Sequence, residues 1–307
     1  MPVIIPETLP ATKVLKECGV FVMNENRAQT QDIRPLRICI LNLMPDKITT
    51  ETQLLRKLSN GIIQIEITLL AIKGHKSKNT AQTHLDDFYS YFDDVKEQYF
   101  DGLIVTGAPV EMLDFESVTY WEELTTILDW SKTHVYSSLF ICWASQVALY
   151  HFYGIEKQRF EKKLFGVYPH TAEEKNSKLL IGMDDVFYVP QARNTQSDVQ
   201  AVRLHPDLKV IASSEQAGLH LVATHDERQL FMTGHPEYDP DSLLNEYLRD
   251  IDEPFVSVPE NYFVDNDPQK EIRTLWQSDA SIFYQNWLNY FVYQETWFDL
   301  TPEHRKG

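Results

Sequence analysis

The chain has 307 residues, 43% of them hydrophobic and 12% aromatic, which is typical of a folded globular protein rather than a disordered one. Its net charge of −17 argues against a nucleic-acid-binding protein, because the phosphates of nucleic acids require a basic surface. No apolar run approaches the ~20 residues that span a bilayer, and no basic segment followed by an apolar one opens the sequence. We therefore expect a cytoplasmic protein without nucleic-acid or membrane partners.

The cysteines and glycines exclude several kinds of site. The three cysteines, Cys18, Cys39 and Cys142, form no Cys-x-x-Cys motif, so neither a disulfide framework nor a structural zinc site is indicated. The sequence contains neither Gly-x-Gly-x-x-Gly nor Gly-x4-Gly-Lys-[Ser/Thr], so nucleotide binding through those loops has no support. We expect no metal and no bound cofactor.

Strand-like and helix-like segments alternate after a loop-like start, which we treat as an extension over about residues 1–35. Runs of apolar residues predict strands in the first half at 36–43, 62–70, 100–107 and 136–142. Apolar residues at helical spacing predict helices at 48–58, 120–131 and directly after Cys142. The second half adds predicted strands at 185–189, 209–212, 219–223 and 229–233, and helices at 239–249 and 281–292.

This alternation predicts an α/β fold with a mostly parallel sheet and helices on both of its faces. No repeat, low-complexity tract or linker divides the chain, so we expect a single domain over residues 1–307. Sites in such sheets form beyond the carboxyl ends of the strands. Because Asn42, Gly107, Cys142 and His235 all lie at predicted strand ends, one cleft can collect them.

Cys142 lies where a predicted strand turns directly into a helix-like run. A thiol at such a junction is exposed on a tight turn beside helix N-terminal amides, which lower its pKa and can hold a developing oxyanion. Phe140 and Ala144 replace the glycines of the Gly-x-nucleophile-x-Gly elbow, although Ala144 and Ser145 are small enough for a sharp turn. A free cysteine is more often a buried hydrophobic residue, an interpretation that fits Cys39. The junction favours Cys142 as a nucleophile.

An imidazole and a carboxylate follow another predicted strand, in Gly234-His235-Pro236-Glu237. His235 taken alone is more often a structural histidine, and Glu237 a solvated loop residue. Together with Cys142 they form a nucleophile, a base and a group that orients the base, which is the arrangement of acyl transfer. Gly107, after the third strand, allows close backbone approach and is a candidate second oxyanion contact, or simply a turn.

Six segments resemble the homoserine O-acyltransferases of methionine biosynthesis. They are Asn42–Arg56, Gln64–Leu70, Thr106–Glu111, Ile141–Trp143, Lys163–Gly166 and Gly234–Asp239. The resemblance covers nearly the whole chain in order. It implies a flavodoxin-like three-layer sandwich similar to class I glutamine amidotransferases. It also implies ping-pong transfer, in which Cys142 takes an acyl group from acyl-CoA as a thioester and His235 helps an amino-acid hydroxyl to accept it.

The resemblance assigns roles to further residues. Lys163 and Arg249 match residues that contact the amino-acid substrate, and both can bind an α-carboxylate. Arg249 alone would otherwise be read as a cation at a helix C-terminus. Glu111 matches the position that discriminates acyl donors, where Glu accompanies acetyl-CoA and Gly accompanies succinyl-CoA. A carboxylate there would repel the carboxylate of succinyl, so we expect acetyl-CoA as the donor substrate.

One segment departs from the family. Where members usually read Pro-His-Ser-Arg-Tyr-Thr, this chain has Gln191, Ala192 and Asn194 within residues 190–195. Ala192 replaces a serine that helps to hold the acceptor, and one methylene changes binding by only ~1–3 kcal/mol. We therefore expect L-serine as the acceptor, in cysteine biosynthesis, with L-homoserine as the alternative.

Two further alternatives remain. One is a glutamine amidohydrolase on the same fold, although no ATP-binding motif for a partner synthetase occurs. The other is a non-catalytic binding protein that keeps the scaffold. A homodimer is a possible assembly.

Overall fold

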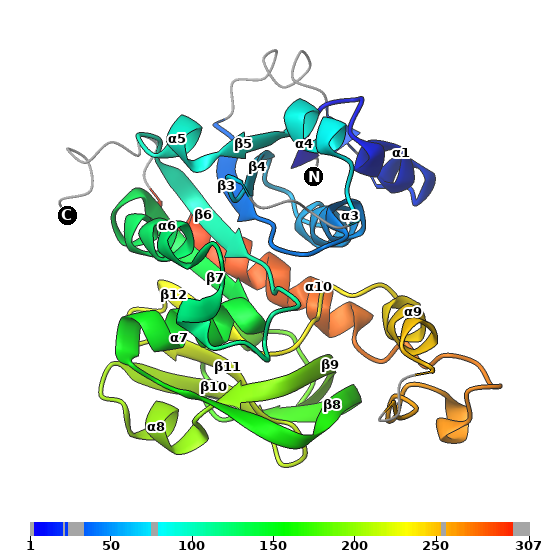
Figure 1. The fold of residues 1–307 in the computed structure, drawn as a ribbon. Helices are drawn as coiled ribbons and strands as arrows, with labels where there is room; N and C mark the ends of the chain where they lie inside the picture. Colours follow the sequence, from blue (N-terminus) through cyan, green and yellow to red (C-terminus); the bar gives the residue numbers. More distant parts are fainter. Residues whose placement is uncertain (1–2, 21, 24–33, 75–78, 253–255, 297–307) are drawn as a thin grey trace.

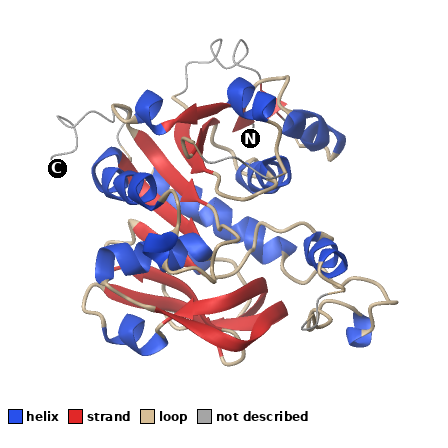
Figure 2. Ribbon diagram, in the orientation of Figure 1, coloured by secondary structure: helices blue, strands red, loops and turns tan. Residues whose placement is uncertain are grey.

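A 12-stranded sheet organises the molecule, which is a computed structural model (Figure 1). It describes residues 3–20, 22–23, 34–74, 79–252 and 256–296. The strands follow the order β2-β1-β4-β3-β6-β7-β12-β11-β10-β8-β9, with β5 paired to β4. Figure 2 shows helices on both sides of this sheet.

The first part of the sheet is parallel. It consists of β1 (Val3–Ile4), β2 (Val22–Met23), β3 (Leu36–Leu41), β4 (Ile65–Ala71), β5 (Tyr89–Tyr91), β6 (Phe100–Val105), β7 (Val135–Ile141) and β12 (Gln229–Met232). Strands β3 and β6 are almost fully buried, as expected of parallel strands that are covered on both faces.

The second part of the sheet is antiparallel and continues from β12. It consists of β11 (Gly218–Thr224), β10 (Leu208–Ser214), β8 (Lys157–Ala172) and β9 (Val186–Ser197). In Figure 1 these strands form the lower part of the molecule. Because parallel pairings outnumber antiparallel ones among the described strands, the mostly parallel α/β sheet is confirmed.

Helices cover the sheet on both faces. They are α1 (Pro10–Glu17), α3 (Lys47–Leu58), α4 (Gln82–Phe88), α5 (Phe92–Val95), α6 (Trp121–His134), α7 (Trp143–Tyr153), α8 (Val199–Leu204), α9 (Ser242–Arg249) and α10 (Gln277–Asn286), which continues as a π-helix over Trp287–Tyr293. Single 3₁₀ turns lie at Phe115–Ser117, Lys178–Leu180 and Val264–Asn266. None of the helices described is long and apolar enough to cross a membrane.

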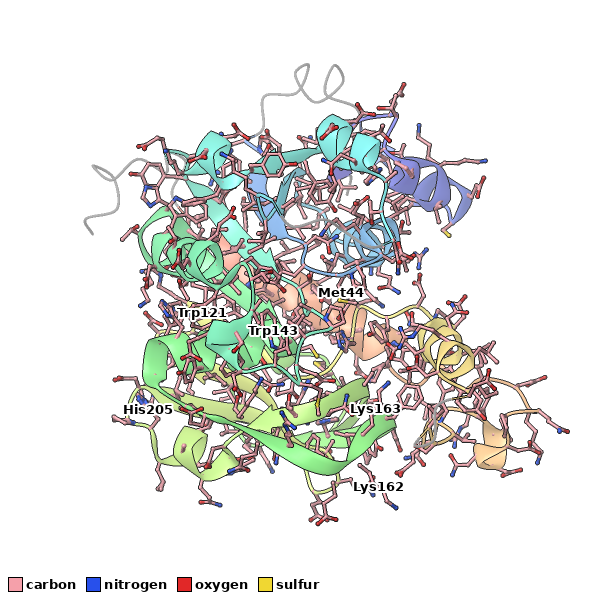
Figure 3. The ribbon with its side chains drawn as sticks, in the orientation of Figure 1. Met44, Trp121, Trp143, Lys162, Lys163 and His205 are labelled. Atoms are coloured by element: carbon pink, nitrogen blue, oxygen red, sulfur yellow. The ribbon has the colours of Figure 1, made fainter. Side chains whose placement is uncertain are left out.

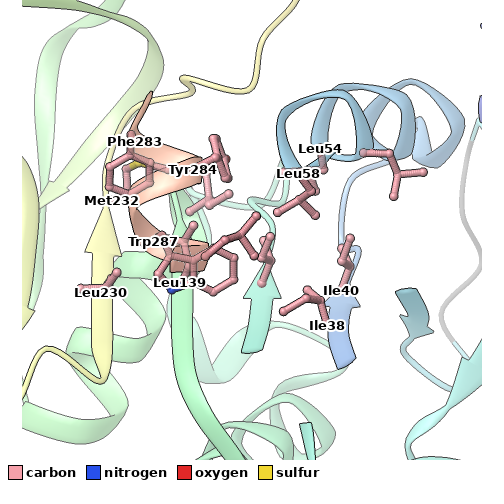
Figure 4. Close-up of a cluster of buried hydrophobic side chains, with 14 of the residues drawn as sticks. Ile38, Ile40, Leu54, Leu58, Leu139, Leu230, Met232, Phe283, Tyr284 and Trp287 are labelled. Atoms are coloured by element: carbon pink, nitrogen blue, oxygen red, sulfur yellow. The ribbon is translucent and has the colours of Figure 1, made fainter. Parts of the chain in front are cut away.

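Two hydrophobic clusters hold the layers together. One face packs α1, α3 and α10 against the strands. Figure 4 shows Phe283 and Tyr284 of α10, with Trp287 at the start of the π-helix, between strands β7 and β12 and helix α3. The other face packs α6 and α7 through residues such as Leu124, Phe140 and Val147. A third, smaller cluster joins β8 and α9 to Trp276.

Two expectations from the sequence are wrong. The start of the chain is not a loop over its described part, because β1 and β2 extend the sheet and α1 packs on α3; residues 24–33 lie outside the described residues. Strand β8 was not predicted, because Lys157–Lys163 is largely charged and lacks a period of two. A single domain over residues 1–307 stays a prediction.

Candidate active site

Cys142 lies at the sharp turn between β7 and α7 that the sequence predicts. Its backbone has φ 54° and ψ −117°, a strained conformation for a residue with a Cβ. The turn is held because Cys142 N donates to Met232 O at 2.7 Å and Ser145 Oγ donates to Cys142 O at 2.6 Å. Cys142 is only 8% exposed, so the expected open exposure of this residue is wrong.

Gly107 brings a second loop against the turn. A Cβ added to Gly107 would lie 3.3 Å from Cys142 Cβ and 3.7 Å from Trp143 N. The first distance is shorter than an ordinary van der Waals contact, so glycine lets the loop after β6 approach without displacing Cys142. Asn42, also predicted at a strand end, is fully buried, and its side-chain Nδ2 donates to Tyr89 Oη at 3.0 Å.

His235 and Glu237 form a buried pair beside Cys142. His235 Nδ1 lies 2.7 Å from Glu237 Oε1, and the two residues are 4% and 5% exposed. Burial by itself lowers the pKa of His235. The adjacent Cys142 and Glu237, each hydrogen-bonded to the ring, nevertheless raise that pKa well above its ordinary value. This arrangement places an imidazole that tends to be charged beside the Cys142 thiol, as in cysteine nucleophiles that a neighbouring histidine activates.

The turn that carries His235 packs closely against β9. His235 N donates to Pro190 O at 2.9 Å. A Cβ on Gly234 would lie 2.5 Å from Val189 Cγ1 and 2.7 Å from Gln191 Nε2, so the contact requires glycine. The segment that departs from the family therefore touches the backbone of His235, the predicted base.

Glu111 lies in the turn after β6 and binds the same segment from its other end. Its Oε2 accepts from Asn194 N at 2.8 Å and from Thr195 Oγ1 at 3.4 Å, and its Oε1 accepts from Asn194 Nδ2. Asn194 stands where the family has tyrosine. Arg193, between these contacts, is fully buried, and burial lowers its pKa to about 10 against the raising effect of Cys142 and Glu111. Glu111 and Cys142 thus border one region.

Lys163 on β8 and Arg249 at the end of α9 both pair with Asp250. Figure 3 shows Lys163 on β8, on the side toward α9. Lys163 Nζ lies 3.4 Å from Glu246 Oε2 and 3.8 Å from Asp250 Oδ2, while Arg249 Nε pairs with Asp250 Oδ1 at 2.6 Å. The structure therefore brings the two predicted acceptor-binding cations together.

A cleft of about 560 Å³ lies beside this cluster. Its lining includes Met44, Gln53, Tyr238, Glu246 and Arg249. Ala192 is half-buried, pairs with Phe165 in the β8–β9 register and packs beside the cluster that contains Tyr238.

Sequence reasoning missed Tyr238 and Glu246. The Tyr238 ring stacks on His235 with centroids 4.3 Å apart and planes 16° apart. Glu246 and Arg249 are three positions apart, so a helical-face argument on α9 could have paired them. In the part of the chain that is described, no group of three or more His, Cys, Asp or Glu side chains is placed to hold a metal ion.

Comparisons with known proteins agree with this geometry. A family profile described as homoserine O-succinyltransferase matches residues 2–298. A homoserine O-acetyltransferase of Brevibacillus brevis is 49% identical over 99% of this chain and 100% of its own length. Another homoserine O-acetyltransferase, from Acetivibrio thermocellus, is 52% identical over 98% of this chain and 99% of its own.

Solved structures resemble the chain in fold. A glutamine amidotransferase of Thermotoga maritima superposes with a TM-score of 0.55 at 12% identity, over 85% of this chain and 99% of its own. One from Methylobacillus flagellatus has a TM-score of 0.51 at 12% identity, over 84% and 95%. At these identities the likeness concerns fold alone, and it confirms the predicted sandwich of the class I glutamine amidotransferase type.

Proposed function

Because the chain belongs to the homoserine O-succinyltransferase family, and is thus an acyltransferase, we propose that it moves acetyl from acetyl-CoA to the hydroxyl of L-homoserine. The expectation of L-serine as acceptor is not supported, since relatives about half identical are named homoserine O-acetyltransferase. We accordingly propose a role in methionine rather than cysteine biosynthesis. The glutamine amidohydrolase alternative rests only on a fold shared at low identity.

In the first half-reaction Cys142 acts as the nucleophile. Its thiolate Sγ attacks the carbonyl carbon of acetyl-CoA. The backbone amides of Gly107 and Trp143, which lie beside Cys142, are the proposed donors to the oxygen that gains charge. The C–S bond to CoA then breaks, and the CoA thiolate takes the proton from the His235 imidazolium. Acetyl remains on Cys142 as a thioester, and His235 is left neutral.

In the second half-reaction His235 is the general base. It takes the proton of the acceptor hydroxyl, whose oxygen attacks the thioester carbonyl, and the Cys142–acetyl bond breaks to regenerate the thiolate. Glu237 fixes the Nδ1–H tautomer and stabilises the imidazolium that re-forms. Loss of the Cys142 charge in the acetyl-enzyme removes one of the two groups that raise the pKa of His235. The lower pKa of His235 keeps the imidazole neutral, so that it can accept the proton of the acceptor hydroxyl.

The donor is assigned from Glu111. Its carboxylate accepts hydrogen bonds from Asn194 and Thr195, which fix it at the border of the Cys142 site. A fixed negative charge there disfavours the carboxylate of a succinyl group and leaves acetyl unaffected.

The acceptor is assigned to the cluster around α9. An α-carboxylate would bind Lys163 and Arg249, and the α-ammonium would pair with Glu246 or Asp250, the acids that now neutralise these cations. We further propose a cytoplasmic enzyme with no nucleic-acid partner, consistent with its net charge of −17. A homodimer is the assembly to test.

The observation that carries this proposal is the Cys142–His235–Glu237 triad on the strained turn. Acetyl-CoA turnover is measured by thiol release with L-homoserine or L-serine, in the wild type, in Cys142→Ala and in Cys39→Ala. We expect L-homoserine to give the higher kcat/KM. Cys142→Ala should lose activity by at least about 10⁴-fold, whereas Cys39→Ala keeps it. Higher kcat/KM with L-serine, or activity in Cys142→Ala, contradicts the proposal.

A further inference from the structure

Tyr238 occupies a fixed position beside the catalytic pair. It is 6% exposed, and its ring lies parallel to the His235 imidazole with centroids 4.3 Å apart. Its backbone carbonyl accepts from Trp276 Nε1 at 2.9 Å and from Gln277 Nε2 at 2.7 Å. Since both the ring face and the backbone are held, the direction of the phenol is set by the fold.

The phenol reaches the charged cluster on the other side. Tyr238 Oη donates to Glu246 Oε1 at 2.8 Å, and the other carboxylate oxygen, Oε2, lies 3.4 Å from Lys163 Nζ. Lys163 is itself held over the Phe165 ring at 4.3 Å. One side chain therefore joins the imidazole to the acid that neutralises a candidate acceptor-binding cation.

The space next to this bridge is suited to a small zwitterion. Tyr238, Glu246 and Arg249 all line the cleft of about 560 Å³. Among the described residues, Glu246 is the hydrogen-bond partner of Tyr238 Oη, and it can pair either with Lys163 or with an ammonium group of a ligand. Holding Glu246 Oε1 limits how tightly this carboxylate can close on Lys163, and so keeps the lysine available to a ligand carboxylate.

We propose that Tyr238 is a positioning residue: its hydroxyl orients Glu246 for the acceptor amino acid of the second half-reaction, and its ring orients His235, which acts in both half-reactions. This inference rests on the proposed acetyl transfer through Cys142. The two parts of the Tyr238 side chain have different roles. The hydroxyl affects binding of the acceptor, and the ring affects the orientation of His235.

Tyr238→Phe tests the hydroxyl because it keeps the stacked ring. Acetylation of Cys142 by acetyl-CoA, followed by intact mass, should stay within about twofold of the wild-type rate. The KM for L-homoserine should rise about tenfold with kcat little changed, the effect expected for one hydrogen bond to a charged group. Tyr238→Leu removes the ring as well and should lower the rate constants of both half-reactions.

A matched control separates position from stability. Tyr262 is fully buried in the same small cluster, and its hydroxyl bonds only to backbone atoms, Pro240 O and Leu244 N, in the described contacts. Tyr262→Phe should lower thermal stability without raising KM for the acceptor. In a Glu246→Gln background, Tyr238→Phe should add little to KM, because the two residues act through one hydrogen bond.

The outcomes separate the two proposals. If the wild type forms no acetyl adduct on Cys142, the proposed function itself fails. If the wild type turns over but Tyr238→Phe leaves KM unchanged, slows both half-reactions equally, or behaves like Tyr262→Phe, only the role of Tyr238 is overturned. Additive KM effects of Tyr238→Phe and Glu246→Gln would also overturn it.

Discussion

The end of the parallel strands and the neighbouring antiparallel edge contribute to the site in different ways. Cys142 and His235 follow the adjacent strands β7 and β12, which are in register at Ile141 and Met232, and Cys142 N is tied to Met232 O. Lys163 lies on the partly exposed strand β8 and pairs with Glu246 of α9. Ala192 lies on the partly exposed strand β9, where the nearby Asn194 binds Glu111 of the turn after β6.

We expect the ends of the parallel strands to set the rate of the reaction and the antiparallel edge to set the choice of substrate. The proposed catalytic atoms are placed by buried backbone, which has little freedom to move. The proposed substrate contacts are side-chain pairs from distant segments, which single substitutions can rearrange. Changes at the strand ends should therefore cost rate with every substrate, whereas changes at the antiparallel edge should redistribute preference among substrates.

Among the variants that leave Cys142 in place, Glu237→Gln should produce the largest effect. The amide keeps the shape but no longer stabilises the imidazolium of His235, so we expect kcat to fall about 10³-fold with either acceptor. Steady-state kinetics with L-homoserine and L-serine check this. If Glu237→Gln changed the acceptor preference instead of lowering kcat equally with both acceptors, the strand ends would not be limited to setting the rate.

His235→Ala tests the charge on Cys142 through pH. Below its raised pKa His235 is an imidazolium that stabilises the thiolate, and this help is lost as the pH rises through that pKa. At pH 7 a free thiol of pKa ~8.5 is only ~3% ionised, so alkylation of Cys142 should slow about 30-fold in His235→Ala.

The rate of iodoacetamide alkylation across pH measures this directly. Cys39 serves as the internal control, because burial raises its pKa to about 12 and leaves it unreactive. Equal pH profiles in the wild type and His235→Ala would mean that the imidazole does not ionise Cys142.

Glu111→Gly should change the preference between acyl-CoA donors without removing acyl transfer itself. Removing the carboxylate also removes its hydrogen bonds to Asn194, so the ratio of kcat/KM for succinyl-CoA to that for acetyl-CoA should rise at least about tenfold. Glu111→Gln, which removes the charge and keeps the size, is the matched control. An unchanged ratio in both variants would remove Glu111 from donor selection.

Ala192→Ser should have the smallest effect. Restoring the hydroxyl found in other family members adds one polar contact to the acceptor region, and we expect kcat/KM for L-homoserine to rise about threefold or more. Acceptor competition assays measure this. A gain for L-serine in its place would show that residue 192 does not favour the longer substrate.

The strand ends could be predicted from the sequence because their signals are local. Apolar runs that end near Cys142 and His235 predict a strand and the turn that follows it in each case. An α/β sheet brings the carboxyl ends of such strands together. The start of the chain was misread because β1 and β2 are two residues each and depend on pairing with distant strands. Such short elements carry no period of their own.

The antiparallel edge was harder to predict for a related reason. Charged residues cover much of the first half of β8, so its strand depends on pairing with β9 rather than on its own pattern. Glu111 contacts Asn194, and Tyr238 contacts Glu246. The spacing of residues along the chain does not predict either contact. The resemblance located Lys163, Arg249 and Glu111 without indicating their neighbours.

The central claim is that Cys142 carries the acetyl group from acetyl-CoA to L-homoserine. Intact mass of the enzyme mixed with acetyl-CoA, followed in time after either amino acid is added, tests it most directly. We predict an acetyl adduct that maps to Cys142, is absent in Cys142→Ala, and is discharged faster by L-homoserine than by L-serine. An enzyme that turns over without the adduct, or an adduct that L-homoserine fails to discharge, would contradict the claim.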